Sequence, residues 1–179
     1  ADHALRACYA GVDMIRRVDE LNVSRRKAVE EGLDEPFHEI NIGIGINTGQ
    51  CVVGNMGSDM RFDYTALGDT VNLASRLEGQ SKPYGVPIIL GDNTAAIVSP
   101  RVATMEIDQI RVKGKLEPER IHALIGLEDM LQNQDFVALD AVNRRMLASY
   151  RGQEWQTALD ALVEIGPLAE RVGFGVKEY

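Results

Sequence analysis

The sequence predicts an α+β fold, in which a largely antiparallel sheet with helices is followed by a helical hairpin. Three observations lead to this prediction. The chain opens with a long amphipathic pattern, continues with short alternating segments between glycine-rich turns, and closes with two further helical patterns. Its 179 residues, 45% hydrophobic and 26% charged, suffice for one domain of ordinary size with an extension.

Residues 1–31 are predicted to form one long helix. Apolar residues recur at three- and four-residue spacing from Ala4 to Leu21, and charged residues occupy the outer positions. Asp2 can cap this helix at its start, and Gly32 can end it.

Three strands are predicted next, over 38–46, 50–56 and 61–67, and their short turns favour an antiparallel meander. Isoleucines alternate with glycines in the first, so that Gly43 and Gly45 offer no side chain on one face. Such glycines usually mark the close approach of another backbone, a helix or a ligand. The glycines of this region fit neither the Walker spacing nor a strand–GxGxxG–helix order, which disfavours a P-loop or dinucleotide-binding fold.

The stretch 62–77 changes from a strand pattern to a helical one. Asp69 is predicted to cap a helix over 69–80. Asn72 and Arg76 are four residues apart, so they share a helix face turned away from the apolar stripe. An amide and a guanidinium near the positive end of a helix suit a phosphate-bearing ligand, although the pattern alone also describes a solvated helix face.

The rest of the sheet region is predicted to contain strands and one short helix, at 86–90, 92–98 (the helix), 102–112 and 120–127. From residue 129 the spacing is helical, with a break at Gly152, which predicts an αα-hairpin. Residues 150–158 faintly resemble a tetratricopeptide unit. A single unit is not a solenoid, so a hairpin packed on the main domain is the favoured interpretation.

The composition narrows the class of protein. A net charge of −8 argues against a general nucleic-acid surface but is compatible with a local cationic pocket for a nucleotide. No apolar run reaches the ~18 residues of a membrane span, and no signal peptide is recognisable. Because the chain does not begin with Met, we expect it to be part of a longer protein. Cys8 and Cys51 are expected to be buried free thiols.

Common catalytic and metal-binding patterns are missing from the sequence. There is no Ser–His–Asp motif. Asp59, Asp63 and Asp69 offer no convincing pair for a two-metal site. The three histidines lack metal-ligand spacing and are expected to be structural or exposed; they are His3, His38 and His122.

Three segments, 44–49, 53–57 and 64–77, resemble the class III adenylate/guanylate cyclase catalytic domain of the bacterial type, and 2–7 and 112–115 match it as well. The resemblance covers roughly residues 1–127. It implies a ferredoxin-like core that works as a homodimer, with ATP or GTP bound at the interface. The implied reaction is attack of the ribose 3′-oxygen on the α-phosphorus, which yields a cyclic nucleotide for intracellular signalling and pyrophosphate.

The resemblance also implies roles for four residues. Asn72 matches the asparagine that orients the ribose, and Arg76 matches the arginine that stabilises the pentacovalent transition state. Lys113 matches the lysine that holds the terminal phosphates. Thr65 falls at the base-recognition position, three residues before Gly68. Threonine there resembles the adenylate-cyclase subgroup, so the expected substrate is ATP and the expected product cyclic AMP.

The chain departs from the family pattern at its start. In the family, two metal-binding aspartates and a second base-contacting lysine precede the segment that matches residues 2–7. No metal ligand is therefore assigned in this chain, and Mg²⁺ or Mn²⁺ is expected to bind upstream aspartates. Residues 1–128 are expected to be the C-terminal two-thirds of a cyclase domain, and 129–179 a helical extension.

Two expectations follow from this departure. The chain alone is expected to be inactive, with an open sheet edge covered by dimerisation or strand exchange. The alternative is a non-catalytic, cyclase-like module for nucleotide binding or dimerisation that regulates an attached output. Either would be cytoplasmic, and a membrane-anchored parent is compatible with both.

Overall fold

A computed structural model of the chain describes residues 2–33, 35–58, 61–111 and 118–174. In chain order the elements are α1 (His3–Glu30), β1 (Ile44–Ile46), β2 (Val52–Ser58), β3 (Arg61–Leu67), α2 (Asp69–Tyr84), β4 (Ile88–Gly91), α3 (Asp92–Val98), β5 (Ala103–Ile110), β6 (Glu119–Gly126), the 3₁₀ turn η1 (Met130–Gln132), α4 (Gln134–Arg151) and α5 (Trp155–Val172). The predicted α+β class and the C-terminal helical hairpin are confirmed. The first predicted strand is shorter than expected, because only its last three residues pair.

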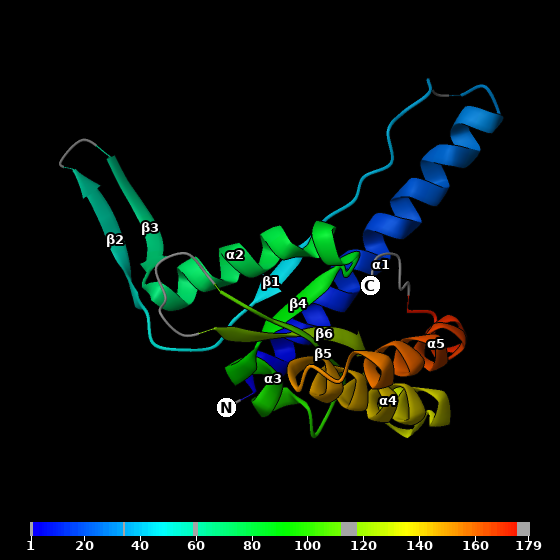
Figure 1. Cartoon of the computed structure of the whole chain (residues 1–179). Coiled ribbons are helices and arrows are strands. Elements are labelled where there is room, and N and C mark those ends of the chain that lie inside the picture. The colour runs from blue at the N-terminus through cyan, green and yellow to red at the C-terminus, as the bar shows by residue number, and fades with distance from the viewer. Residues whose placement is uncertain (1, 34, 59–60, 112–117, 175–179) are drawn as a thin grey trace.

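The four-stranded sheet has the order β1-β4-β6-β5 (Figure 1). β1 runs parallel to β4, whereas β6 is antiparallel to both of its neighbours. β2 and β3 form a separate antiparallel pair. The predicted meander is therefore wrong. The chain leaves β1, forms the β2–β3 hairpin and returns through α2, so that the crossover places β4 beside β1 in the parallel direction.

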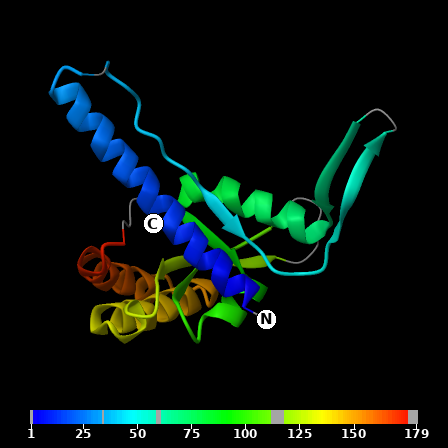
Figure 2. The ribbon, with the colours of Figure 1, turned by 180° about the vertical axis from the view of Figure 1, so that it is seen from behind.

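Helices cover the two faces of the sheet (Figures 1 and 2). The side chains of β4 contact helices on both faces. Ile88 and Leu90 face the cluster formed with α1 and α3, whereas Ile89 between them faces the cluster formed with α2. All three are at most 3% exposed. This alternation is the period of a strand buried on both faces.

The glycine face of β1 admits α2, as the sequence predicts. A Cβ added at Gly45 would lie 2.1 Å from the carbonyl oxygen of Ala74 and 2.4 Å from the amide nitrogen of Glu78. The backbones of strand and helix are thus in direct contact, a packing that only glycine permits.

The α4–α5 hairpin packs on the start of β5. Ala103 and Met105 share a core cluster with apolar residues of both helices. The buried Asn143 of α4 donates from Nδ2 to the carbonyl oxygen of Glu106 at 2.7 Å, and Arg151 forms an ion pair with the Glu106 carboxylate. The hairpin is therefore joined to the sheet by apolar and polar contacts.

Three local predictions are wrong. Asp2 occupies the cap position of α1 but makes no side-chain capping hydrogen bond. Asp69 does not cap α2, because Gly68 occupies the cap position and Asp69 is already in the first turn. Cys51 is exposed, since its segment leads into the projecting β2–β3 hairpin, whereas Cys8 is buried as predicted. Gly32 ends α1 with φ +72° as expected. None of the described helices is both long and apolar enough to cross a membrane.

Candidate functional site

The predicted site residues lie on two consecutive elements, β3 and α2. Thr65 is exposed on β3, opposite Gly54 of β2 in the hairpin register. Gly68 joins the strand to the helix with φ +150°, a backbone conformation that residues with a side chain rarely adopt. The carbonyl oxygen of Gly68 accepts from the amides of Val71 and Asn72 at 3.0 and 3.1 Å. The chain therefore turns from strand to helix within one residue.

Asn72 and Arg76 lie on the outer face of α2, in its first and second turns. Leu73 and Leu77 are 3% and 0% exposed and fix the helix on the sheet, whereas Asn72 and Arg76 are exposed. The two polar residues thus share a face that is turned away from the apolar stripe, as the sequence predicts. The amide and the guanidinium are thus presented to solvent by a helix that is itself held in the core.

Arg76 differs from many arginines of this chain in its electrostatic surroundings. Arginines within ion-pairing distance of a carboxylate are Arg16, Arg17, Arg26, Arg101, Arg144, Arg145, Arg151 and Arg171. Within the part of the chain that the structure describes, Arg76 has no such partner. Its planar guanidinium keeps its full set of donors for an anionic ligand.

The segment after β1 positions the start of α2, a role that the sequence prediction missed. The half-buried Asn47 donates from Nδ2 to the carbonyl oxygen of Thr70 at 3.1 Å. A Cβ added at Gly49 would lie 2.4 Å from the hydroxyl of Thr70, so this glycine lets the turn approach the helix. The available signal was the polar-glycine turn at 47–49, but its partner could not be read from local sequence.

The Oδ1 atom of Asn47 is buried and has no hydrogen-bond partner in the described structure. It lies beside Gly91, where an added Cβ would approach it to 2.4 Å. An orphaned acceptor of this kind usually binds a water molecule.

The described residues do not fit a divalent-metal site. Across 2–33, 35–58, 61–111 and 118–174, no group of three His, Cys, Asp or Glu side chains could hold a metal ion. Asp63 is exposed on β3, and Asp69 is exposed in the first turn of α2. Asp59 and the predicted phosphate ligand Lys113 lie outside the described residues.

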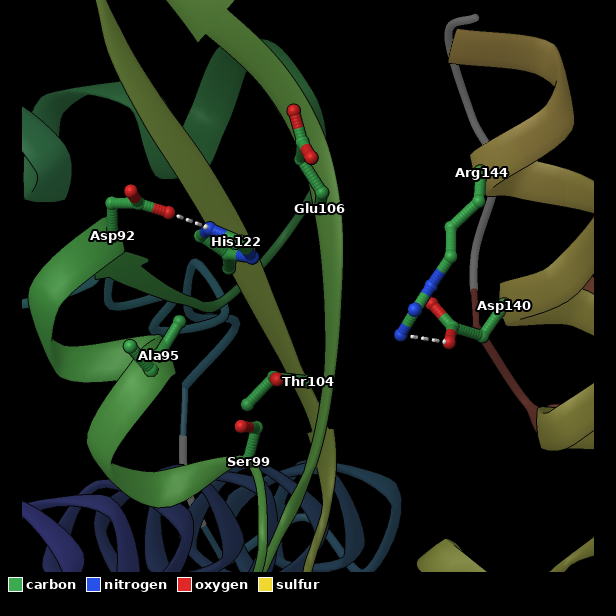
Figure 3. Close-up of a pocket in the computed structure, with 9 residues that line it drawn as sticks. Asp92, Ala95, Ser99, Thr104, Glu106, His122, Asp140 and Arg144 are labelled. Atoms are coloured by element: carbon green, nitrogen blue, oxygen red, sulfur yellow. Dashed lines mark hydrogen bonds and ion pairs between the residues drawn. The ribbon is translucent and has the colours of Figure 1, made fainter. Parts of the chain in front are cut away.

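A cavity of about 280 Å³ lies elsewhere, between α3, β5, β6 and α4 (Figure 3). His122 pairs with Asp92 at 2.9 Å across 30 residues of sequence, and on the other side Asp140 pairs with Arg144 at 2.7 Å. Glu106 adds a third carboxylate. The charged groups of this cavity are satisfied within the protein, because Glu106 is bound to Arg151 and Asp140 to Arg144, and the prediction of a structural or exposed His122 agrees with its partly buried hydrogen bond to Asp92.

Comparisons with known proteins agree with the resemblance. The family model described as "Adenylate and Guanylate cyclase catalytic domain" matches residues 1–126. Adenylate cyclase 1 of Rhizobium meliloti is 34% identical over 125 residues, which are 70% of this chain but only 18% of that protein.

Two solved structures share the fold. The adenylyl cyclase CyaB from P. aeruginosa is 34% identical, with a TM-score of 0.50, over 64% of this chain and 54% of that one. The guanylyl cyclase Cya2 is 33% identical, with a TM-score of 0.54, over 70% of this chain and 59% of that one. The chain therefore spans little more than half of these solved chains and a small part of the curated relative.

Proposed function

The chain belongs to the adenylate and guanylate cyclase catalytic domain family, and from this premise we propose that its parent protein is an adenylate cyclase. The proposed reaction converts ATP to cyclic AMP and pyrophosphate. The observation that carries the proposal is the pairing of exposed Asn72 with an unpaired Arg76 on the anchored helix α2. The same positions match the family's ribose-orienting asparagine and transition-state arginine.

Arg76 is suited to the proposed step. As the 3′-oxygen attacks, negative charge develops on the oxygens of the α-phosphate. A guanidinium with free donors stabilises such charge, and because α2 is held by Leu73, Leu77 and the Asn47 contact, little reorganisation is needed. Asn72, one turn earlier on the same face, supplies an amide that can accept from or donate to the ribose.

Overall similarity does not decide the base, since an adenylyl and a guanylyl cyclase match at 34% and 33% identity. Thr65 supports ATP. Its exposed hydroxyl can accept a hydrogen bond from the adenine 6-amino group. One hydrogen bond of about 0.5–1.5 kcal/mol gives a roughly 2- to 12-fold preference.

Homodimerisation is the second part of the proposal, and the β2–β3 hairpin supports it. Its exposed apolar residues are Val52, Val53, Tyr64 and Leu67, at 53–76% exposure. An isolated two-stranded hairpin is marginally stable in water, so this one needs a covering surface. A second copy would supply that surface next to Thr65 and so close the nucleotide site at the interface.

The metal is the third part. The family resemblance implies Mg²⁺ or Mn²⁺, and the described residues do not fit such a site. Residues 1–179 alone are accordingly proposed to be inactive, with the metal ligands in the rest of the cyclase fold.

The test measures cyclic AMP and cyclic GMP formation, with Mg²⁺ or Mn²⁺, by the protein that contains the complete cyclase domain. Arg76→Ala is expected to lower kcat by about 10²-fold or more, with Arg76→Lys only partly active because it lacks the planar fork. Arg120→Ala, which removes an exposed arginine of β6, is the matched control and should be neutral.

Two results would redirect the proposal. Unchanged turnover of the Arg76→Ala variant would show that Arg76 does not stabilise the transition state. Nucleotide binding without any cyclic product from the complete domain would support the alternative, a non-catalytic module for nucleotide binding or dimerisation.

A further inference from the structure

Helix α5 has apolar residues on two neighbouring faces, one buried and one exposed. On the first face Ala158, Ala161, Ile165 and Ala169 are 0–5% exposed, and the last three belong to the core shared with α4. On the second face Trp155, Leu159 and Val163 are 55%, 56% and 77% exposed. Four-residue spacing keeps these three on one side of the helix, and they are called the α5 stripe below.

Within the described residues, Trp155 of the α5 stripe packs edge-to-face on Tyr150, with ring centroids 5.7 Å apart, but both residues remain more than half exposed, so the stripe stays open to solvent. α5 packs mainly on α4 and lies at the periphery of the molecule (Figure 1). A surface helix of a globular protein normally has one apolar face, which is directed to the core. A second face that contains tryptophan and two aliphatic residues therefore indicates an interaction surface, because such patches seldom remain exposed without a function.

The charges around the stripe indicate the chemistry of the partner. α5 contains Asp160, Glu164 and Glu170, and its single basic residue, Arg171, is already bound to Asp135 at 2.7 Å. Arg145 neutralises Glu164 at 2.6 Å. Asp160 accepts only from the neutral amide of Gln156 at 2.9 Å, and both Asp160 and Glu170 are exposed.

The stripe is thus bordered by uncompensated negative charge, which favours a partner with basic flanks. A second copy of the chain is disfavoured, because a symmetric contact through this stripe would gather the carboxylates of both copies at one interface.

The backbone adds a polar feature to the end of the stripe. Pro167 lies inside α5 and has no N–H, so the carbonyl oxygen of Val163 lacks the usual donor four residues later. This carbonyl belongs to Val163, the residue with the most exposed side chain of the stripe. A lysine or arginine side chain of a partner can donate to it.

We propose that the α5 stripe binds an amphipathic helix whose large apolar residues recur at three- and four-residue spacing and are flanked by lysine or arginine. Bound in this way, the partner is a third helix beside the α4–α5 hairpin. The interaction buries the indole of Trp155 and places basic side chains near Asp160, Glu170 and the Val163 carbonyl. The proposal needs neither nucleotide nor catalysis.

Trp155 is the only tryptophan of the chain, so its fluorescence reports directly on the stripe. The probe is a synthetic helical peptide of about five turns with leucines on one face and lysines on both flanks. One comparison peptide has glutamates in place of the lysines, and another has the same composition in an order without an apolar face. We expect a saturable blue shift with the lysine peptide and at least tenfold weaker binding of the other two.

Variants complete the test. Val163→Glu places a charge in the stripe at a 77% exposed position, so folding should be retained, and it should weaken binding at least tenfold. Val137→Glu introduces the same change at a 55% exposed position on α4 and should bind like the wild type. Circular dichroism of both variants verifies that the hairpin is folded.

Three outcomes would overturn the proposal. The first is no change in Trp155 emission with the lysine peptide, and the second is equal binding of the peptide without an apolar face. The third is a dimer of the wild-type chain that Val163→Glu dissociates in sedimentation equilibrium, because the occupant would then be a second copy.

Discussion

Replacement of Gly45 by alanine tests the central packing contact of the fold. Its Cβ would lie 2.1 Å from the carbonyl oxygen of Ala74 and 2.4 Å from the amide nitrogen of Glu78, whereas real Cβ atoms essentially never approach another heavy atom within 3.0 Å. Both obstacles are backbone atoms, so no side-chain rotation relieves the clash. α2 must therefore move away from β1 by about 0.9 Å, the difference between 3.0 and 2.1 Å.

The cost follows from the side chains that α2 buries. Leu73 and Leu77 are 3% and 0% exposed, and burial of a leucine contributes about 1.5–3 kcal/mol. A gap of 0.5–1 Å forfeits about a quarter to a half of the dispersion energy across it. Gly45→Ala is therefore expected to lower the free energy of unfolding by about 1–3 kcal/mol, which agrees with typical overpacking penalties.

The assay is urea unfolding followed by far-UV circular dichroism at neutral pH. A lower midpoint at constant slope identifies a change in stability rather than in the unfolded state. Gly54→Ala on β2 is the matched control, because nothing lies within 4 Å of its added Cβ, and it should change stability by less than about 0.5 kcal/mol. If Gly45→Ala behaved like Gly54→Ala, the direct contact between β1 and α2 would be refuted.

Three further predictions use other contacts. Gly79 lies in α2, and nothing lies within 4 Å of a Cβ added there. Gly79→Ala should therefore raise the free energy of unfolding in urea by about 0.5–1 kcal/mol, since alanine favours the helix. A lower free energy of unfolding would contradict the open environment. Asn143→Ala should lower the free energy of unfolding by about 1–3 kcal/mol, because it removes the hydrogen bond that the buried Asn143 donates to the carbonyl oxygen of Glu106, and a neutral result would reject that bond. Burial raises the pKa of the Cys8 thiol to about 11, so near pH 8 mass spectrometry after iodoacetamide should find Cys51 labelled and Cys8 unmodified until the chain is unfolded.

The sequence allowed prediction of features that depend on neighbouring residues. The alternation of isoleucine and glycine around Gly45 indicated a close backbone approach, and the structure identifies α2 as the approaching element. The change of period at Gly68 located the strand–helix junction. Both are local signals, because the side-chain period and the tolerance for φ +150° belong to the residues themselves.

Features that depend on distant residues were missed or predicted wrongly. β1 pairs with β4, which follows α2 in the sequence. The turn residues near β1 contain no information about a strand so far along the chain. Cys51 resembles a core residue by pattern, but its hairpin projects from the body. His122 contacts Asp92 only because β6 lies beside the start of α3 in the folded chain.

The two halves of the candidate site differ in how firmly the fold holds them. Asn72 and Arg76 lie on a helix anchored in the core and tied to the turn after β1 through Asn47. Thr65 lies on a hairpin whose strands pair only with each other, and Gly68 is the one residue between β3 and α2. The distance between Thr65 and Arg76 therefore depends strongly on the backbone angles of Gly68. In the proposed nucleotide site, recognition of a base and an α-phosphate of one nucleotide requires that distance to be fixed, so we expect the exposed apolar residues on the two faces of the hairpin to be covered when the site is complete.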